Sequence, residues 1–477
     1  MSWFRNPTCT TRYAGDVLRE ASNISSSTPD TTPSFGQLTK RLLVLGLPIA
    51  VENLLHIFVG LTDTYLANQL DKPAAAAVGA TTYVLWFIGL MTGSVATGST
   101  ALISRATGAN DRRTANAATG QSFLLAGSVG LVLATLLLVL AGPAGGWFGL
   151  ENPQTQAYIT QYLWILGFGV PLAVFTFVGN ACLRGAGDTL TPAIAMIVID
   201  LVNIGLSFGL VYGWGPLPAM GFDGIAWGTA IAYSGGAFVV AAVLIRGSST
   251  GLKLYLHRLR PHVSVIRRVL KVGLPSMFEG LTFWGANFVV LYLVGTLGDV
   301  AGAAHNVVVR VEALSYMTGF AISTAAATMV GQALGRRNPT EAMRSGTVAF
   351  VVGGGFMVGC GVLFVAVPHF LCGLIASEPE IVEQSAKALR VVGFAQIGFA
   401  AMMIYGGALR GAGDTTAVMT RNLGSAIVLR MTGALLVVNV FGFGLIAVWA
   451  VLAIDLMSRG LLLAGRFYSG KWTTREV

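Results

Sequence analysis

The sequence predicts an all-α integral membrane protein built from two similar halves, and three observations support this. Hydrophobic residues make up 54% of the 477 positions and charged residues 11%, whereas soluble domains carry roughly 25% charged residues. Apolar stretches near the roughly 20 residues needed to cross a bilayer follow one another along the chain, and one seven-residue motif occurs twice. The apolar stretches are continuous rather than alternating, which favours helices over the strands of a membrane barrel.

The repeated motif is Leu-Arg-Gly-Ala-Gly-Asp-Thr, at residues 183–189 and again, 226 positions later, at 409–415. A second match at nearly the same step pairs a proline and a glutamate of each half: Pro48 with Glu52, and Pro275 with Glu279. Self-similarity at a fixed period indicates a duplicated unit. The glycines of the motif permit a tight turn between two helices, its arginine is predicted to lie at the cytoplasmic interface, and its aspartate is predicted to cap the next helix.

Each half is predicted to contribute six of about twelve transmembrane helices. Their approximate spans are 43–68, 78–103, 115–141, 155–183, 191–214, 222–245, 272–297, 304–334, 346–367, 384–409, 417–440 and 445–466. Around them we predict a flexible cytoplasmic tail over 1–40, a first lobe over 41–245, a basic cytoplasmic linker over 246–271, a second lobe over 272–466 and a cytoplasmic tail over 467–477.

Basic residues fall mainly in the tails, in the linker and in the loops on one side of the predicted helices. Lysine and arginine are retained in short cytoplasmic loops, so we predict a multi-pass protein of the cell membrane with both termini cytoplasmic. The net charge of +9 agrees with this bias and with contact to anionic lipid headgroups, and we predict no nucleic-acid partner. The four cysteines are scattered, so no metal site and no cofactor is predicted.

Acidic residues inside the predicted helices mark the candidate site. Asp63 lies in the first span, and its counterpart in the second half is Val290. Asp200, Asn203 and Ser207 in the fifth span are spaced to share one helical face. A charged side chain at mid-bilayer costs about 3 kcal/mol on insertion scales and usually marks an ion or proton path. We predict that these residues coordinate a cation or share a proton; the alternative is that the two aspartates lie near helix ends and are solvated or capped.

Motifs in both halves carry a more specific resemblance. They are Val51-Glu52-Asn53-Leu54-Leu55 after Pro48, Thr62-Asp63-Thr64, the two Arg-Gly-Ala-Gly-Asp turns, Ala303-Ala304-His305 and Val330-Gly331-Gln332-Ala333-Leu334-Gly335. In this combination the chain after residue 35 resembles the multidrug and toxic compound extrusion (MATE) transporters, closer to their prokaryotic DinF-like and NorM-like members.

The resemblance implies two six-helix lobes that form a V around a central cavity. It also implies a monomeric antiporter in membrane lipid that exports small organic, often cationic and amphiphilic, compounds in exchange for H⁺ or Na⁺ by alternating access. Asp63 falls on the coupling position of the family, Pro48 on a hinge in the same helix, and Thr229 on another polar position of the first lobe. The family's Asn followed four residues later by Asp is here Asn203 followed by Ser207, so Asp200 is the candidate for the missing carboxylate.

The remaining polar residues inside the spans have two interpretations each. Glu52 and Glu279 are a symmetric pair of carboxylates that serve either structure or coupling. Glu312, with Arg430 and Asp455, either lines the cavity or takes part in mutual charge neutralisation, which is the commoner fate of charges inside a membrane. Candidates for the cavity wall are Phe283, Trp284, Asn287 and Glu312.

Other functional classes fit the sequence less well. A related flippase for lipid-linked precursors is the alternative function, but it would be expected to have extra helices and a strongly basic cavity. A channel or membrane enzyme would need a selectivity filter, a metal-ligand cluster or a Ser/His/Asp constellation, and the sequence contains none of these. We therefore predict a transporter and not an enzyme.

Overall fold

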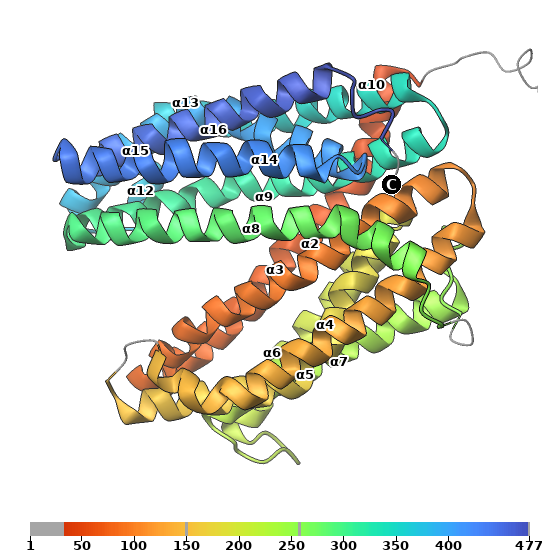
Figure 1. Ribbon diagram of the computed structural model, residues 1–477. Helices are drawn as coiled ribbons and strands as arrows, with labels where there is room; N and C mark the ends of the chain where they lie inside the picture. The colour runs from red at the N-terminus through yellow and green to blue at the C-terminus, as the bar shows by residue number, and fades with distance from the viewer. Residues whose placement is uncertain (1–32, 148–150, 256–258, 476–477) are drawn as a thin grey trace, which may run out of the picture. The chain divides into compact units, whose positions relative to one another are not determined.

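The regular structure of this protein is helical. In the computed structural model the described residues are 33–147, 151–255 and 259–475, and within these ranges there are helices but no strands (Figure 1). Twelve helical segments in this part of the chain are long and apolar enough to cross a membrane. The predicted all-α fold with about twelve spans is therefore confirmed. Of the predicted tail over 1–40, residues 1–32 lie outside the described residues, as do 256–258 of the predicted linker and 476–477 of the C-terminal tail.

Six helices lie in the described part of the first half, from residue 33 to the linker. They are α2 (Phe35–Leu70), α3 (Lys72–Gly108), α4 (Arg112–Trp147), α5 (Pro153–Ala186), α6 (Leu190–Tyr212) and α7 (Phe222–Arg246). Several are longer than the predicted spans, because hydropathy marks only the part inside hydrocarbon. The 36 residues of α2, at a rise of about 1.5 Å each, extend about 54 Å, well beyond the ~30 Å of hydrocarbon.

The second half also contains six spans, two of which are interrupted by π-helical turns. Its elements are α8 (Val263–Thr296), α9 (Asp299–Gly335), α10 (Pro339–Ala349), η2 (Phe350–Gly354), α11 (Gly355–Ala366), α12 (Pro368–Gly373), α13 (Pro379–Gly411), α14 (Thr415–Ser425), η3 (Ala426–Met431), α15 (Thr432–Leu435), η4 (Leu436–Val440) and α16 (Leu445–Tyr468). Helices α10 to α11 form one span and α14 to η4 another. The span from α14 to η4 corresponds to α6 in the first half, and α6 is a regular α-helix.

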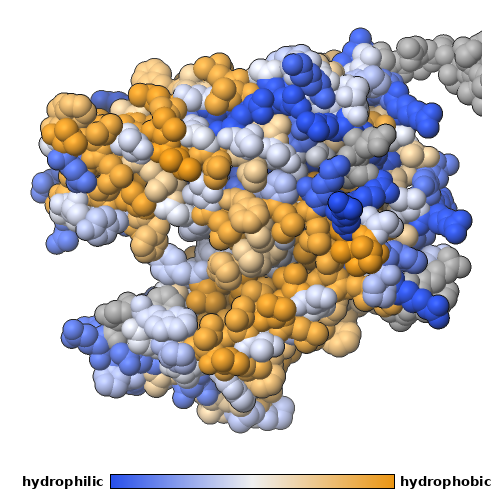
Figure 2. All heavy atoms as spheres, in the orientation of Figure 1, coloured by the Kyte–Doolittle hydropathy of each residue, from blue (hydrophilic) through white to orange (hydrophobic). Residues whose placement is uncertain are grey.

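Exposed apolar side chains cover much of the molecule. Figure 2 shows hydrophobic side chains over the middle of the visible face and hydrophilic ones gathered toward its ends. Large residues such as Val139 and Phe238 are 68% and 69% exposed. An exposed apolar surface of this extent is expected where lipid rather than water surrounds a protein.

The two halves meet where α3 packs against α8 and α9 and where α2 packs against α9. Glycine makes this contact possible, because a Cβ atom on Gly108 would lie 2.0 Å from the carbonyl oxygen of Gln332, and one on Gly335 would lie 2.1 Å from that of Arg105. Gly108 and Gly335 end α3 and α9, the second helix of each half. The duplicated glycines therefore hold equivalent ends of the two halves together.

The repeated turns keep their backbone but differ in the role of their aspartates. Gly187 and Gly413 both have positive φ angles, of 95° and 84°, which favour glycine. Asp188 caps α6 by accepting a hydrogen bond from the Thr191 amide at 3.0 Å, as predicted. Asp414 does not cap α14. Its carboxylate forms an ion pair with Arg466 instead. The predicted cap is therefore wrong in the second copy, because the arginine occupies the carboxylate.

Pro48 and Pro275 lie inside α2 and α8, the first helix of each half. A proline cannot donate a backbone hydrogen bond and its ring crowds the preceding turn, so each helix is weaker at that point. The hinge assigned to Pro48 is therefore physically reasonable, and it stays a prediction.

Candidate functional site

Asp63 is buried in the first half, held by side chains from two neighbouring helices. It lies on α2, seven residues before the helix ends, and is 3% exposed. The Thr229 hydroxyl on α7 lies 2.9 Å from Oδ2 and 3.1 Å from Oδ1. The Tyr162 hydroxyl on α5 donates to Oδ2 at 3.1 Å. Asp63 is therefore neither solvated nor a helix cap, and the alternative interpretation does not describe it.

Two of the residues predicted on α6 join this network. The Asn203 amide donates to the Thr229 hydroxyl at 3.0 Å and lies 3.4 Å from the Ser207 hydroxyl. Both α6 residues are fully buried, and the Asn203 carbonyl oxygen has no hydrogen-bond partner. The structure thus brings Asp63, Asn203, Ser207 and Thr229 together with Tyr162. We call these five residues the first-half cluster.

Asp200 lies close to the first-half cluster but does not bond to it. It is 5% exposed and neither carboxyl oxygen has a hydrogen-bond partner. Tyr233 on α7 interacts electrostatically with both Asp63 and Asp200, and its hydroxyl is bonded to His56 at 3.1 Å. Asp200 therefore shares a neighbourhood with Asp63, one helical turn away from the hydrogen-bonded group.

Within the described ranges, the carboxylates of Asp63 and Asp200 form no ion pair with a basic side chain. The residues around Asp63 offer oxygen atoms: carboxylate, two hydroxyls, a phenol and the unpartnered carbonyl of Asn203. Oxygen is the donor that hard cations prefer, and a carboxylate is also a proton acceptor. In the part of the chain that the structure describes, no three His, Cys, Asp or Glu residues are placed to hold a metal ion together. The first-half cluster can therefore accept one proton or one small cation of low charge.

Tyr162 is the member of the cluster that the sequence analysis missed. It lies in the fourth span, 1% exposed, one turn beyond Tyr158 and two beyond Thr155, so spacing alone does not distinguish it from its neighbours. Its role depends on how α5 packs beside α2, and that contact leaves no periodic signal in the sequence. A tyrosine deep inside an apolar span is the one hint available, because a buried phenol usually has a hydrogen-bond partner.

Glu52 and Glu279 occupy equivalent places in the two halves, and each pairs with the arginine of a repeated turn. Arg184 lies 2.6 Å from Glu52, and Arg410 lies 2.5 Å from Glu279. An asparagine also donates to each carboxylate, Asn180 at 3.2 Å and Asn422 at 2.6 Å. The turn arginines thus reach inward to a buried glutamate in the first half and a partly buried one in the second. The two asparagines come from helices that do not correspond, α5 and α14, but the two ion pairs are equivalent, and this symmetry supports a structural role for both pairs.

The second half contains a buried cluster of a different kind. Asp455 on α16 is fully buried between two guanidinium groups, with Arg430 Nε 2.8 Å from Oδ2 and Arg459 Nε 2.8 Å from Oδ1. Arg430 also donates to Asn287 at 2.8 Å and lies over the Phe283 ring, 5.3 Å from its centre. We call these five residues the second-half cluster. Arg430 and Asp455 therefore neutralise each other's charge, which is one of the two interpretations given for them above.

The other cavity candidates are dispersed. Glu312 on α9 is 8% exposed and accepts a hydrogen bond from Gln396 at 3.4 Å. It interacts electrostatically with Arg430 but is not bonded to it. Trp284 on α8 contacts Trp86 on α3, with ring centres 4.7 Å apart. Trp284 therefore lies at the contact between the halves, and Phe283 and Asn287 lie against Arg430.

Comparison with known proteins finds one family twice in this chain. The MatE family model matches residues 48–208 and again residues 275–436, once in each half. A protein of Thermotoga maritima named "Probable multidrug resistance protein NorM" is 29% identical over 449 residues, which cover 92% of this chain and 94% of that protein. The "Multidrug resistance protein NorM" of Burkholderia vietnamiensis is 27% identical over 451 residues, 91% of this chain and 95% of the other.

Solved structures share the fold. One described as "Crystal structure of MATE in the bent conformation" superposes with a TM-score of 0.83 at 22% identity, over 92% of this chain and 99% of that one. The Vibrio cholerae MATE transporter VcmN in the bent form also gives 0.83, at 19% identity, over 92% and 99% of the two chains. Both similarities extend over both halves.

Proposed function

Because this chain belongs to the MatE family of transporters, we propose that it is a secondary active antiporter that exports organic compounds in exchange for H⁺ or Na⁺. The relatives named for multidrug resistance support efflux of organic compounds, often cationic and amphiphilic. The observation that carries the coupling is the state of Asp63: a buried carboxylate bonded to neutral hydroxyls, with no basic partner.

The physical basis of coupling is the cost of a buried charge. An unpaired carboxylate in a low-dielectric interior is unfavourable unless it gains a proton or a cation. Binding of a proton or cation to Asp63 therefore stabilises the arrangement in which the first-half cluster is closed. Loss of that ion favours an arrangement in which water reaches the carboxylate. Pro48 lies fifteen residues earlier on the same helix, where α2 bends at low cost.

Exchange follows when ion and substrate favour different arrangements of the two halves. A ligand shifts such an equilibrium only by its differential affinity for the two states. In this scheme the ion stabilises one arrangement through Asp63, the organic substrate stabilises the other, and each turn of the cycle moves them in opposite directions. We further propose that the protein works as a monomer in the cell membrane with both termini in the cytoplasm, which the basic tails and loops support.

Transport in proteoliposomes tests the proposal. Purified full-length protein is reconstituted, and movement of the fluorescent cation ethidium is followed under a pH gradient, a Na⁺ gradient or neither. We expect uphill ethidium movement with one gradient and none when an ionophore dissipates it. Ethidium that only equilibrates, at the same rate with and without either gradient, would indicate a channel and contradict antiport. Protein-free liposomes are the control for leak.

A further inference from the structure

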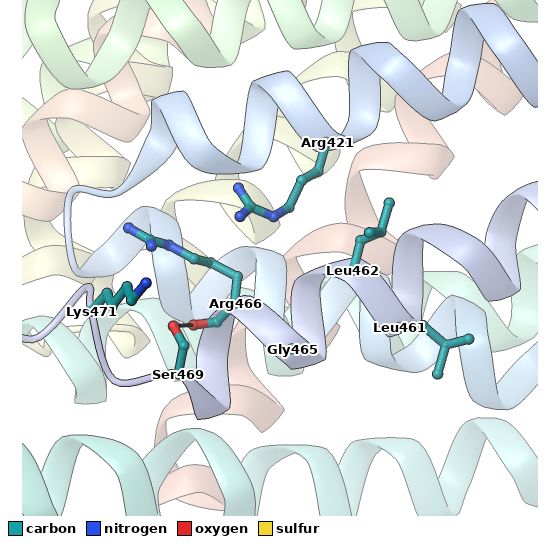
Figure 3. Close-up of a pocket in the computed structure, with 7 residues that line it drawn as sticks. All are labelled: Arg421, Leu461, Leu462, Gly465, Arg466, Ser469 and Lys471. Atoms are coloured by element: carbon teal, nitrogen blue, oxygen red, sulfur yellow. Dashed lines mark hydrogen bonds between the residues drawn. The ribbon is translucent and has the colours of Figure 1, made fainter.

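A basic pocket lies at the end of the second half, apart from both buried clusters. Its volume is about 300 Å³, and it is lined by Arg421, Leu461, Leu462, Gly465, Arg466, Ser469 and Lys471 (Figure 3). Arg421 comes from α14, Arg466 from the last turn of α16, and Lys471 from the segment after α16. Three cationic side chains therefore gather from three parts of the chain around one space.

Two of these charges are not neutralised. Arg466 forms an ion pair with Asp414 at 2.6 Å. Arg421 donates to the carbonyl oxygen of Ala417 in its own helix at 2.9 Å, and no acidic side chain among the described residues pairs with it or with Lys471. The pocket thus has excess positive charge, and an anion can enter it without displacing an internal partner.

The pocket is held in place by packing. Trp472, next to Lys471, is fully buried, stacks on Phe467 with ring centres 5.1 Å apart and donates to its carbonyl oxygen at 2.6 Å. The position equivalent to Arg421 in the first half, 226 residues earlier, is Ala195. The fold of this span therefore does not require an arginine, and folding alone does not explain Arg421 in the second half.

An apolar wall continues from the charged end into the membrane span. Leu461 and Leu462 on α16 are 71% and 48% exposed. They precede Arg466 by five and four residues, which places them about 7.5 and 6 Å deeper along the helix. The 24 residues of α16 extend about 36 Å, slightly more than the hydrocarbon thickness. In a bilayer crossed by α16, Arg466 and Lys471 at the end of this helix would be level with the headgroups, and the leucines with the acyl chains.

We propose that this pocket binds the headgroup phosphate of an anionic phospholipid, with an acyl chain of the same lipid lying along Leu461 and Leu462. Arginine and lysine form charge-assisted hydrogen bonds to phosphate oxygens, and basic pockets between membrane helices suit anionic headgroups. Because Asn422, next to Arg421, bonds to Glu279 on α8, the bound lipid holds the end of α14 at its junction with α8 and α16. This inference does not depend on the coupling assigned to Asp63.

Lipid binding to the delipidated full-length protein in detergent tests the proposal. Native mass spectrometry measures retention of added phosphatidylglycerol or phosphatidylcholine by the wild type, by the double variant Arg421→Gln/Lys471→Gln and by the control Arg113→Gln/Arg267→Gln. The control removes the same charge at two exposed positions outside the pocket. Each basic side chain contributes about 1 kcal/mol to binding an anionic lipid, so the pocket variant should bind phosphatidylglycerol about 30-fold more weakly and the control should bind it like the wild type.

Three results would overturn the proposal: equal binding of the two lipids by the wild type, equal loss in the pocket and control variants, or displacement of phosphatidylglycerol by an equal concentration of inorganic phosphate. The last would mean that the leucines contribute nothing and that the pocket takes a free anion. A matching elution volume for all three proteins in size-exclusion chromatography establishes that the variants are folded.

Discussion

The first-half cluster and the second-half cluster are both buried in their halves, and they differ in charge. The first uses α2, α6 and α7 with α5, and the second uses the corresponding helices α8, η3 and α16. In the first, Asp63 has only neutral donors. In the second, Asp455 lies between two arginines. Duplication has kept a buried polar site in both halves, and of these two clusters only the first has a carboxylate without a basic partner.

The largest expected difference between the clusters is in stability. Asp455→Asn leaves the guanidiniums of Arg430 and Arg459 buried without a counter-charge, and removal of one partner from a buried pair costs about 3–5 kcal/mol. We expect a large drop in melting temperature measured in detergent, whereas Asp63→Asn removes an unpaired buried carboxylate and should melt at or above the wild-type temperature. Equal destabilisation by the two changes would show that the two carboxylates are held in similar electrostatic surroundings.

Glu52 and Glu279 should behave alike, because their ion pairs are copies of one arrangement. Each of Glu52→Gln and Glu279→Gln weakens a half-buried pair with a turn arginine, and we expect about 1–3 kcal/mol of destabilisation in both. Melting temperature and the apparent ion affinity for transport are the two measurements. A change of ion affinity in one variant alone would show that its carboxylate takes part in coupling.

Tyr162 and Tyr158 on α5 each donate a hydrogen bond to an aspartate, but only Tyr162 contacts Asp63. Tyr162→Phe removes a hydrogen bond to a carboxylate, worth about 1.5–3 kcal/mol when that group is charged, so the ion concentration for half-maximal transport should change about tenfold or more. Tyr158→Phe is the matched control, because its hydroxyl donates to Asp71 near the end of α2, at 3.2 Å. Similar ion dependence in the two variants would remove Tyr162 from the coupling site.

The smallest effect is expected at Asp200. It has no hydrogen bond to the first-half cluster, so Asp200→Asn should change the apparent ion affinity less than Asp63→Asn does. A variant that transports with unaltered ion dependence would exclude Asp200 as the substitute for the family's missing carboxylate. A loss as complete as that of Asp63→Asn would place it inside the coupling site.

Most of the fold can be predicted from the sequence, because hydropathy and duplication are properties of long segments. The sequence also predicts Asp63, Asn203, Ser207 and Thr229 as site residues, because polar side chains are rare in apolar spans. The sequence does not predict the role of Tyr162 or the pairing of Asp414 with Arg466, because both depend on which helices pack together. The π-helical turn at Arg430 leaves no pattern in the sequence either, although it sets the direction from which that arginine reaches Asp455.

Gradient-driven ethidium transport by Asp63→Asn in proteoliposomes, beside the wild type and the exposed control Glu378→Gln, shows whether coupling resides in the first-half cluster. We predict that the Asp63 variant reconstitutes and melts normally but loses uphill transport under both pH and Na⁺ gradients, while the control keeps it. Uphill transport by Asp63→Asn at the wild-type rate and with the same ion dependence would contradict the account.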